Sequence, residues 1–228
     1  GNVLVLAYPH VPYHDASFIN KAIDVALAGK VEACIIAGDM FDVNAFSPFD
    51  PNLADVLEDE FAAGEAFITT LAETFKEILV LTGNHEGRIL KRLGFHQIEH
   101  ARLKRLFDPE DVAEFTPYYF CHVGDWMVCH PKNVSSIPGR VAARLAEKYH
   151  CNVVAAHGHT FGLAQDVSGQ YLGIDSGCCA DPTRLEYIAL RPNLRPQVHQ
   201  GAVILKDGYP WLLNKHLDTN RIKQALRR

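Results

Sequence analysis

The sequence predicts an α/β fold in which two packed mixed β-sheets are flanked by helices. In the first half of the chain, short β-branched runs of strand length alternate with longer segments whose apolar residues recur at helical spacing. In the second half, shorter strands follow one another with turn residues between them. At 228 residues and 48% hydrophobic content, the chain can bury a substantial core, and we expect one domain over residues 1–228.

The first half begins with a strand, a helix and a second strand. Apolar residues recur at helical spacing from Phe18 to Leu27, Gly29 stops that helix, and Asp15 is placed to cap its start. A long helical stretch, a third strand and a basic amphipathic segment follow. The expected elements are a strand at Val3–Ala7, a helix at Ala16–Ala28, a strand at Cys34–Ala37, a helix from about Leu53 to Phe75, a strand at Ile78–Thr82 and the basic segment Arg88–Phe107.

Beyond Pro117 the pattern changes to short strands and tight turns. Gly124-Asp125, Ser168-Gly169 and Asp207-Gly208 supply turn residues between apolar runs. A helix near Arg140–Tyr149 interrupts the strands, and a basic helix ends the chain. The strands expected here are Tyr118–Val123, Trp126–His130, Val153–Ala156, Tyr171–Ile174, Ala202–Leu205 and Trp211–Asn214.

Composition and charge narrow the range of functions. A formal charge of −5 gives no overall basic field, which argues against strong nonspecific binding to nucleic acid. There is no apolar run of membrane-spanning length and no signal peptide, so we expect a soluble, cytoplasmic protein with no membrane partner. The six cysteines are scattered without a paired CxxC arrangement, which favours buried reduced thiols over a disulfide framework.

Clusters of metal-ligand residues follow the apolar runs. Because functional groups converge at the strand ends of open α/β sheets, donors distant in the sequence are expected to meet around metal ions. Tyr8-Pro9-His10 follows the first strand in this way. Four further clusters do the same: Gly38-Asp39-Met40-Phe41-Asp42, Gly83-Asn84-His85-Glu86, Cys129-His130 and His157-Gly158-His159. Together they predict a dinuclear metal site.

In this order and at these separations, the clusters resemble the motifs of the calcineurin-like metallophosphoesterase family. The likeness runs from about Val3 to Leu205, and the segment Tyr8–Asp15 is similar to the first motif of the compact single-domain members of bacteria and their phages. Each motif alone would more often be a structural turn; jointly, each at a strand end, they are specific. The resemblance implies a four-layer α/β/β/α sandwich and hydrolysis of a phosphate ester at two metal ions.

The resemblance assigns a role to each matching residue. Asp39 corresponds to the carboxylate that bridges both metals, and Asp42 to an acid that orients a histidine ligand. His85 matches the histidine that contacts the scissile phosphate or protonates its leaving oxygen, and Glu86 holds that imidazole or its loop. Arg88 either contacts phosphate or belongs to a surface salt bridge. The remaining ligands form two sets, which are Asn84, His130 and His157 for one metal, and His10 and His159 for the other.

Two alignments compete for the family's Gly-His-x-His motif. In the first, Ala156 takes the glycine place and both imidazoles, His157 and His159, are kept. In the second, Gly158 takes that place and Phe161 replaces a ligand. We choose the first, because it retains both ligands directly after a strand and needs only a small-for-small change.

The first motif departs from the family's Asp-x-His, since Tyr8 stands where the carboxylate of the first metal is expected. Without that oxygen, a site served by His10, Asp39 and His159 is expected to be weak or empty for a hard ion. Tyr8 either binds a ferric ion as a phenolate or fills the space as a neutral ring. We favour the neutral ring, because a tyrosine pKa of about 10 makes the phenolate costly.

The leading hypothesis is a metal-dependent phosphoesterase that cleaves a phosphodiester or nucleotide by attack of a metal-bound hydroxide. Its cofactors would be two divalent ions, Mn²⁺ first, with Fe, Zn, Ni or Mg also compatible. One rival is a degenerate member that serves as a binding scaffold, as the loss of the carboxylate at Tyr8 would permit. Another is a nuclease that tracks nucleic acid on the basic segment Arg88–Arg105.

Overall fold

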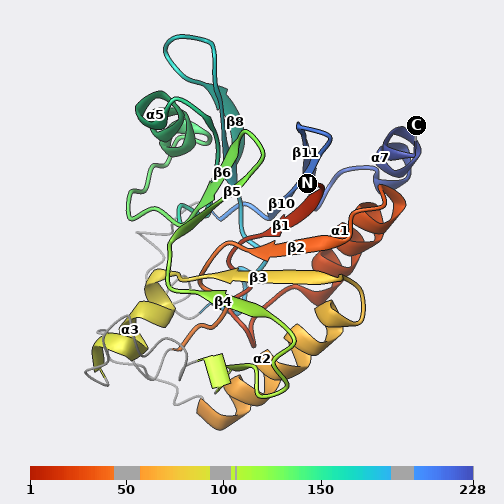
Figure 1. Ribbon diagram of the computed structural model, residues 1–228, viewed down its shortest axis with the longest axis vertical. Helices are drawn as coiled ribbons and strands as arrows, with labels where there is room; N and C mark the ends of the chain where they lie inside the picture. Colours follow the sequence, from red (N-terminus) through yellow and green to blue (C-terminus); the bar gives the residue numbers. More distant parts are fainter. Residues whose placement is uncertain (44–56, 93–103, 106, 186–197, 228) are drawn as a thin grey trace.

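The computed structural model describes residues 1–43, 57–92, 104–105, 107–185 and 198–227, and its two mixed β-sheets lie packed between helices (Figure 1). The six-stranded sheet has the order β11-β10-β1-β2-β3-β4. In it β1 to β4 run parallel to one another, β10 is antiparallel to β1, and β11 is antiparallel to β10. Its strands are β1 (Val3–Leu6), β2 (Ala33–Ile36), β3 (Glu77–Leu81), β4 (Glu114–Thr116), β10 (Gly201–Lys206) and β11 (Tyr209–Asn214).

The five-stranded sheet has the order β5-β6-β7-β9-β8. Its central strands β6, β7 and β9 are parallel, and the two edge strands β5 and β8 are antiparallel to their neighbours. Its strands are β5 (Phe120–Val123), β6 (Trp126–Cys129), β7 (Asn152–Ala155), β8 (Phe161–Gln165) and β9 (Leu172–Ser176).

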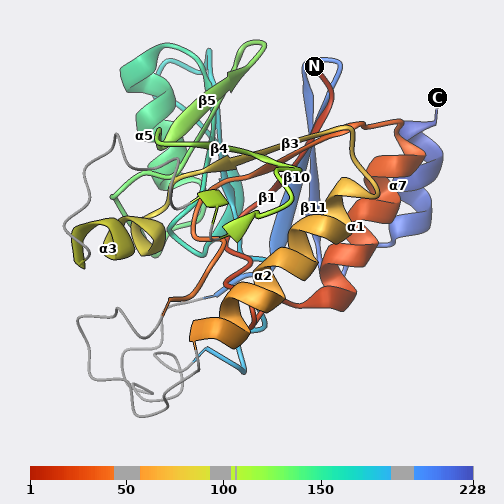
Figure 2. The same cartoon turned by 60° about the horizontal axis from the view of Figure 1, so that its bottom comes forward.

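Helices cover the outer face of each sheet, which gives four layers (Figure 2). The six-stranded sheet carries α1 (Ala16–Ala28), α2 (Leu57–Ala72) and α7 (Thr219–Leu226), and the other sheet carries α5 (Arg140–Tyr149). Helix α3 (Asn84–Arg92) lies apart from these, at the end to which β3 points (Figure 1). The predicted cap of α1 is present, since the Asp15 carboxylate accepts a hydrogen bond from the Phe18 amide at 3.0 Å.

Strand β1 shows why the sheets stack in this way. Val3 and Val5 lie in the apolar core between the two sheets, while Leu4 and Leu6 lie in the core beneath the helices. All four are buried, because successive side chains of a strand point to opposite faces and both faces are covered.

The predicted fold class is confirmed, with two differences in detail. Strands β4 and β8 were not predicted, since β4 has three residues and β8 contains Gly162 and Ala164 in place of β-branched residues. Helix α3 begins at Asn84, earlier than the predicted basic segment, most of which lies outside the described residues. No helix within the described ranges is both long and apolar enough to span a membrane.

The strand directions determine where the predicted motifs lie. Strands β1, β2 and β3 are parallel neighbours, so their carboxyl ends reach one edge of the sheet together. The loops that follow them carry Tyr8 and His10, Asp39, and Asn84. Strands β6 and β7 are likewise parallel neighbours and lead to His130 and His157. Contacts between these two groups of loops join the two sheets at a single rim.

Candidate metal centre

Backbone conformation singles out the rim residues. Five of them have positive φ, a region that side chains other than glycine seldom adopt and that often marks functional sites. These are Tyr8 (55°), His10 (48°), Asp39 (50°), His157 (75°) and His159 (52°).

Two motif glycines let the loops approach closely. A Cβ atom at Gly38, where φ is 81°, would lie 2.5 Å from the Nδ1 atom of His130. A Cβ atom at Gly83 would lie 2.0 Å from the Oδ1 atom of Asp39. Glycine is therefore required before Asp39 and before Asn84, because any side chain there would separate the ligand loops.

Glu86 fastens two of these loops together. Its carboxylate accepts hydrogen bonds from the backbone amides of Asp39 (3.1 Å), Phe41 (3.1 Å) and Gly83 (2.8 Å). Of the two roles predicted for Glu86, the contacts support holding the loop. Glu60 of α2 supports the end of the loop at residues 39–43 in a similar way, since its carboxylate accepts a hydrogen bond from the Val43 amide at 2.5 Å.

One group of donors around His130 has the composition of a metal site. Ligand atoms of Asp39, His130 and His157 all lie within 4.8 Å of one another. Asn84 adds its Oδ1 atom, 3.1 Å from Nε2 of His130. The Nδ1 atom of His130 contacts the carbonyl oxygen of Ala37 at 2.9 Å, which leaves Nε2 as the ligand atom.

Charge around this group favours the ionised form of Asp39. Burial opposes ionisation, but the nearby His130 and His85 more than offset it and hold the pKa of Asp39 well below its usual value. Burial likewise opposes the charged form of His130, yet the Asp39 carboxylate raises the pKa of that imidazole. Burial lowers the pKa of His157 to about 4, helped by the charge of His130.

Asp39 also supplies a direct test of whether a cation fits. Its Oδ2 atom is buried and accepts no hydrogen bond from any described residue. Two imidazole nitrogens lie near it, Nε2 of His130 at 3.4 Å and Nε2 of His85 at 3.8 Å. A buried carboxylate oxygen without a partner is costly, so a bound cation is the natural complement. The donor set, two oxygens and two imidazole nitrogens, suits Mn²⁺, Fe²⁺ or Zn²⁺.

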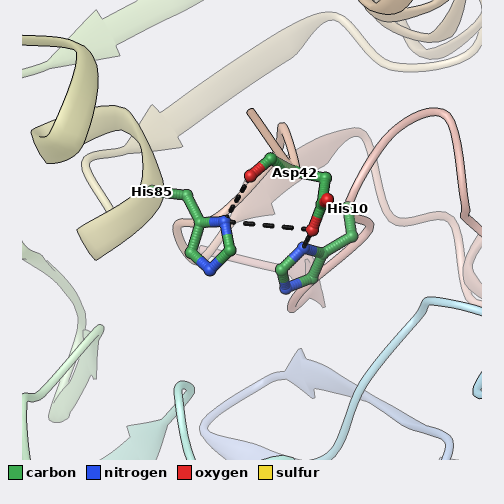
Figure 3. A group of neighbouring side chains, drawn as sticks. All are labelled: His10, Asp42 and His85. Atoms are coloured by element: carbon green, nitrogen blue, oxygen red, sulfur yellow. Dashed lines mark hydrogen bonds and ion pairs between the residues drawn. The ribbon is translucent and has the colours of Figure 1, made fainter. Parts of the chain in front are cut away.

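A second group of possible ligands, His10, Asp42 and His85, is already joined by hydrogen bonds (Figure 3). The Oδ1 atom of Asp42 lies 2.7 Å from Nδ1 of His10. The Nδ1 atom of His85 lies 2.6 Å from the backbone oxygen of Asp42. Through this contact Asp42 holds the imidazole of His10, and the contacts of both histidines use their Nδ1 atoms.

Arg88 lies beside His85 at the mouth of the site. Its Nη1 atom is 3.3 Å from Nδ1 of His85, and the residue is partly exposed. Burial is the main reason why the pKa of His85 is lowered to about 4, although Asp39 acts in the opposite direction. At neutral pH the imidazole of His85 is therefore uncharged in the absence of a bound anion.

Tyr8 contacts both histidines that are expected to serve a first metal. Its ring is stacked on His10 with centroids 4.5 Å apart and meets His159 edge-on with centroids 3.9 Å apart. Its hydroxyl lies 2.9 Å from Nδ1 of His157. Both histidines of the chosen alignment, His157 and His159, therefore contact the same ring, whereas their neighbour Phe161 belongs to β8.

Two buried acids of the site were not found from the sequence. Glu60 gave no signal, because it lies on a helix far along the chain from the loop it supports. Asp175 could have been found, since it is the lone charged residue in the apolar strand β9. It accepts hydrogen bonds from Thr160 Oγ1 (3.1 Å) and from the amide of Gly139 (2.8 Å), so it ties the residue after His159 to the start of α5.

No protein-family model matches the chain, and no curated protein sequence matches it. Among solved structures, Vps29 from Chaetomium thermophilum is similar, with a TM-score of 0.51 at 12% identity over 96% of this chain and 88% of that one. Vacuolar Protein Sorting 29 from Cryptosporidium parvum has a TM-score of 0.46 at 17% identity over 93% and 95%. At such identities the likeness concerns the fold alone.

Proposed function

We propose, from the premise that this chain has the calcineurin-like metallophosphoesterase fold, that it hydrolyses phosphate esters with a divalent metal ion held by Asp39, Asn84, His130 and His157. The observation that carries the proposal is the buried Oδ2 atom of Asp39, which has no hydrogen-bond partner among the described residues and faces two imidazoles. A bound divalent ion would supply Lewis-acid activation of the ester and of water.

The protein's own groups would bind and orient the ester. Asn84 and His157 are the two partly exposed members of the ligand group, so a substrate would approach from their side. Arg88, also partly exposed, places a guanidinium group beside His85, where it would attract a phosphate oxygen. We assign Arg88 to phosphate binding on this ground.

His85 would handle the leaving-group proton. Its Nδ1 atom contacts the carbonyl oxygen of Asp42, so Nε2 is the nitrogen left to face a substrate. The free imidazole has a pKa of about 4, and the negative charge of a bound phosphate would raise that pKa. Once protonated, Nε2 would donate its proton to the leaving oxygen.

A binding scaffold is the second candidate, and Tyr8 is the observation that favours it. A bulky ring in place of a carboxylate is compatible with a fold kept for binding after catalysis is lost. The names of the similar structures refer to vacuolar protein sorting and not to hydrolysis, so they do not separate the two candidates. A nuclease has less support, because most of the basic segment lies outside the described residues and Lys104 pairs with Asp111.

The test is hydrolysis of bis(p-nitrophenyl) phosphate and of nucleotide esters by metal-free protein, with and without added Mn²⁺. We expect turnover only with metal, and its loss in Asp39→Asn. The matched control is Asp207→Asn, which changes an exposed aspartate in the β10–β11 turn at a positive φ that asparagine tolerates. Folded protein that binds Mn²⁺ but hydrolyses no ester would leave the scaffold as the function.

A further inference from the structure

We infer that the ring of Tyr8 takes the place of the first metal ion, so that each chain binds one metal ion and not two. This inference rests on the proposed function only in adopting its metal-binding group, Asp39, Asn84, His130 and His157. It concerns metal count and not catalysis, which allows the two to be tested separately.

The position of the ring is the first support. Tyr8 is 3% exposed and packs against both histidines that the family resemblance assigns to the first metal, with its centroid 4.5 Å from the ring of His10 and 3.9 Å from the ring of His159. An ion shared by two imidazoles sits about 2 Å from each nitrogen, whereas carbon atoms need about 3.5 Å. A phenol ring and a metal ion therefore cannot both occupy this space.

The donor atoms give a second, independent support. Asp39, His130 and His157 converge within 4.8 Å, but among the described residues Asp39, His10 and His159 do not form such a group. Asp39 belongs to both sets, so the difference in convergence arises from the positions of the histidines. The Tyr8 ring packs against both of those histidines, whose own ring centroids lie 5.9 Å apart.

The hydroxyl of Tyr8 gives a third support, because it connects the ring to the remaining metal-binding group. Its oxygen lies 2.9 Å from Nδ1 of His157. That contact leaves Nε2 of His157 as the ligand nitrogen and fixes the plane of the imidazole. Tyr8 would thus act as a positioning residue for one metal site while it fills the other.

His10 presents the strongest argument for a second ion and so defines the control. Its Nδ1 atom pairs with Asp42 at 2.7 Å, and its buried Nε2 atom has no hydrogen-bond partner within the described part of the chain. Such a nitrogen is what a first metal would use. A measurement of whether Nε2 of His10 binds an ion therefore decides whether this position is filled by the Tyr8 ring or is a metal site.

The experiment is titration of metal-free protein with Mn²⁺ by calorimetry, with bound metal counted by elemental analysis. We expect one ion in the unaltered chain, one in His10→Ala, and none bound tightly in His157→Ala. Tyr8→Asp should bind two ions, since it shortens the side chain and restores a carboxylate. Tyr8→Phe should keep one ion with about fivefold to tenfold lower affinity, as expected for the loss of one ordinary hydrogen bond.

Four results would overturn the inference. They are two ions in the unaltered chain, a lower count in His10→Ala, one ion in folded Tyr8→Asp, or a phenolate-to-iron charge-transfer band with Fe³⁺ that Tyr8→Phe removes. If Tyr8→Asp does not fold, His10→Ala and Tyr8→Phe still decide the matter. Binding of one ion without ester hydrolysis would reject the proposed function and keep this inference. Binding of two ions with ester hydrolysis would reject this inference and keep the proposed function.

Discussion

The half of the site around His130 and the half around His10 contain similar residue types but differ in what lies between them. Each histidine has its Nδ1 atom held by an oxygen, the Ala37 carbonyl for His130 and the Asp42 carboxylate for His10. Each therefore presents Nε2. Around His130 that nitrogen meets Asn84 and Asp39, whereas beside His10 lies the ring of Tyr8. Ligand identity and orientation are thus insufficient, because donor atoms make a metal site only where the space between them is open.

The largest expected effect is a difference in Mn²⁺ affinity between substitutions in the two halves of the site. We expect His130→Ala to weaken Mn²⁺ binding by more than about a hundredfold, because it removes a ligand at the centre of the converged group. His159→Ala should change affinity by less than about threefold, although its cavity will lower stability. Calorimetric titration of both variants measures the difference. Equal losses of affinity would remove the distinction between the halves.

A second prediction concerns the support that the His130 half receives from Glu86. Glu86→Gln replaces one acceptor oxygen with an amide group that faces backbone amides, so we expect a loss of about 3 kcal/mol in the free energy of unfolding. Chemical denaturation of metal-free protein measures it. Glu65→Gln, on the exposed face of α2, is the matched control and should change stability by less than about 0.5 kcal/mol. A loss no larger than the control's would show that the loops do not depend on Glu86.

Acid should destabilise the metal-free protein. The pKa values of His85 and His157 are lowered to about 4 from the ordinary value of 6.5, chiefly by burial. Unfolded chains then take up these protons first, so the stability they provide is present above about pH 6.5 and is lost as the pH falls toward 4. His130 acts in the opposite direction because its pKa is raised, whereas His159 adds to the effect of the first two because burial holds its pKa well below 6.5.

Thermal unfolding between pH 7.5 and 4.5 would measure this dependence. We expect the melting temperature to fall by several degrees below pH 6.5, and saturating Mn²⁺ to make the fall steeper by competing with protons. A melting temperature that rose on acidification would mean that the His130 and Asp39 pair dominates the site.

The smallest effect is expected on the His10 side. Asp42→Asn keeps an acceptor for Nδ1 of His10 but loses its charge, so the free energy of unfolding should fall by about 1 kcal/mol. Mn²⁺ affinity should change by less than about threefold if His10 is not a ligand. A tenfold loss of affinity would show that an ion binds on both sides of Asp39.

The sequence was sufficient for the fold and for the rim at which the predicted ligand residues meet. Parallel strands bring their ends together whatever the loops contain, so Asp39, Asn84 and His130 could be predicted to lie at one rim from strand ends alone. Gly38 and Gly83 belong to the sequence motifs, and the structure supplies the reason, which is contact between neighbouring loops.

The remaining features depend on packing that no local pattern records. The position of the Tyr8 ring depends on its contact with His159, which comes from a distant part of the chain. The support from Glu60 requires α2 to lie against the Asp42 loop, and that contact has no counterpart in spacing or periodicity. Sequence motifs identify donors, whereas the volume between the donors is a property of the folded chain.

The three amides held by Glu86 have a consequence for local motion. Because one carboxylate receives the N–H groups of Asp39, Phe41 and Gly83, none of the three can be exposed to solvent without releasing that side chain. Deuterium should therefore enter all three amides at similar rates, through one shared opening event. The loops after β2 and β3 would open and close as a single body, so the carboxylate and amide ligands they carry would leave or meet a metal ion together.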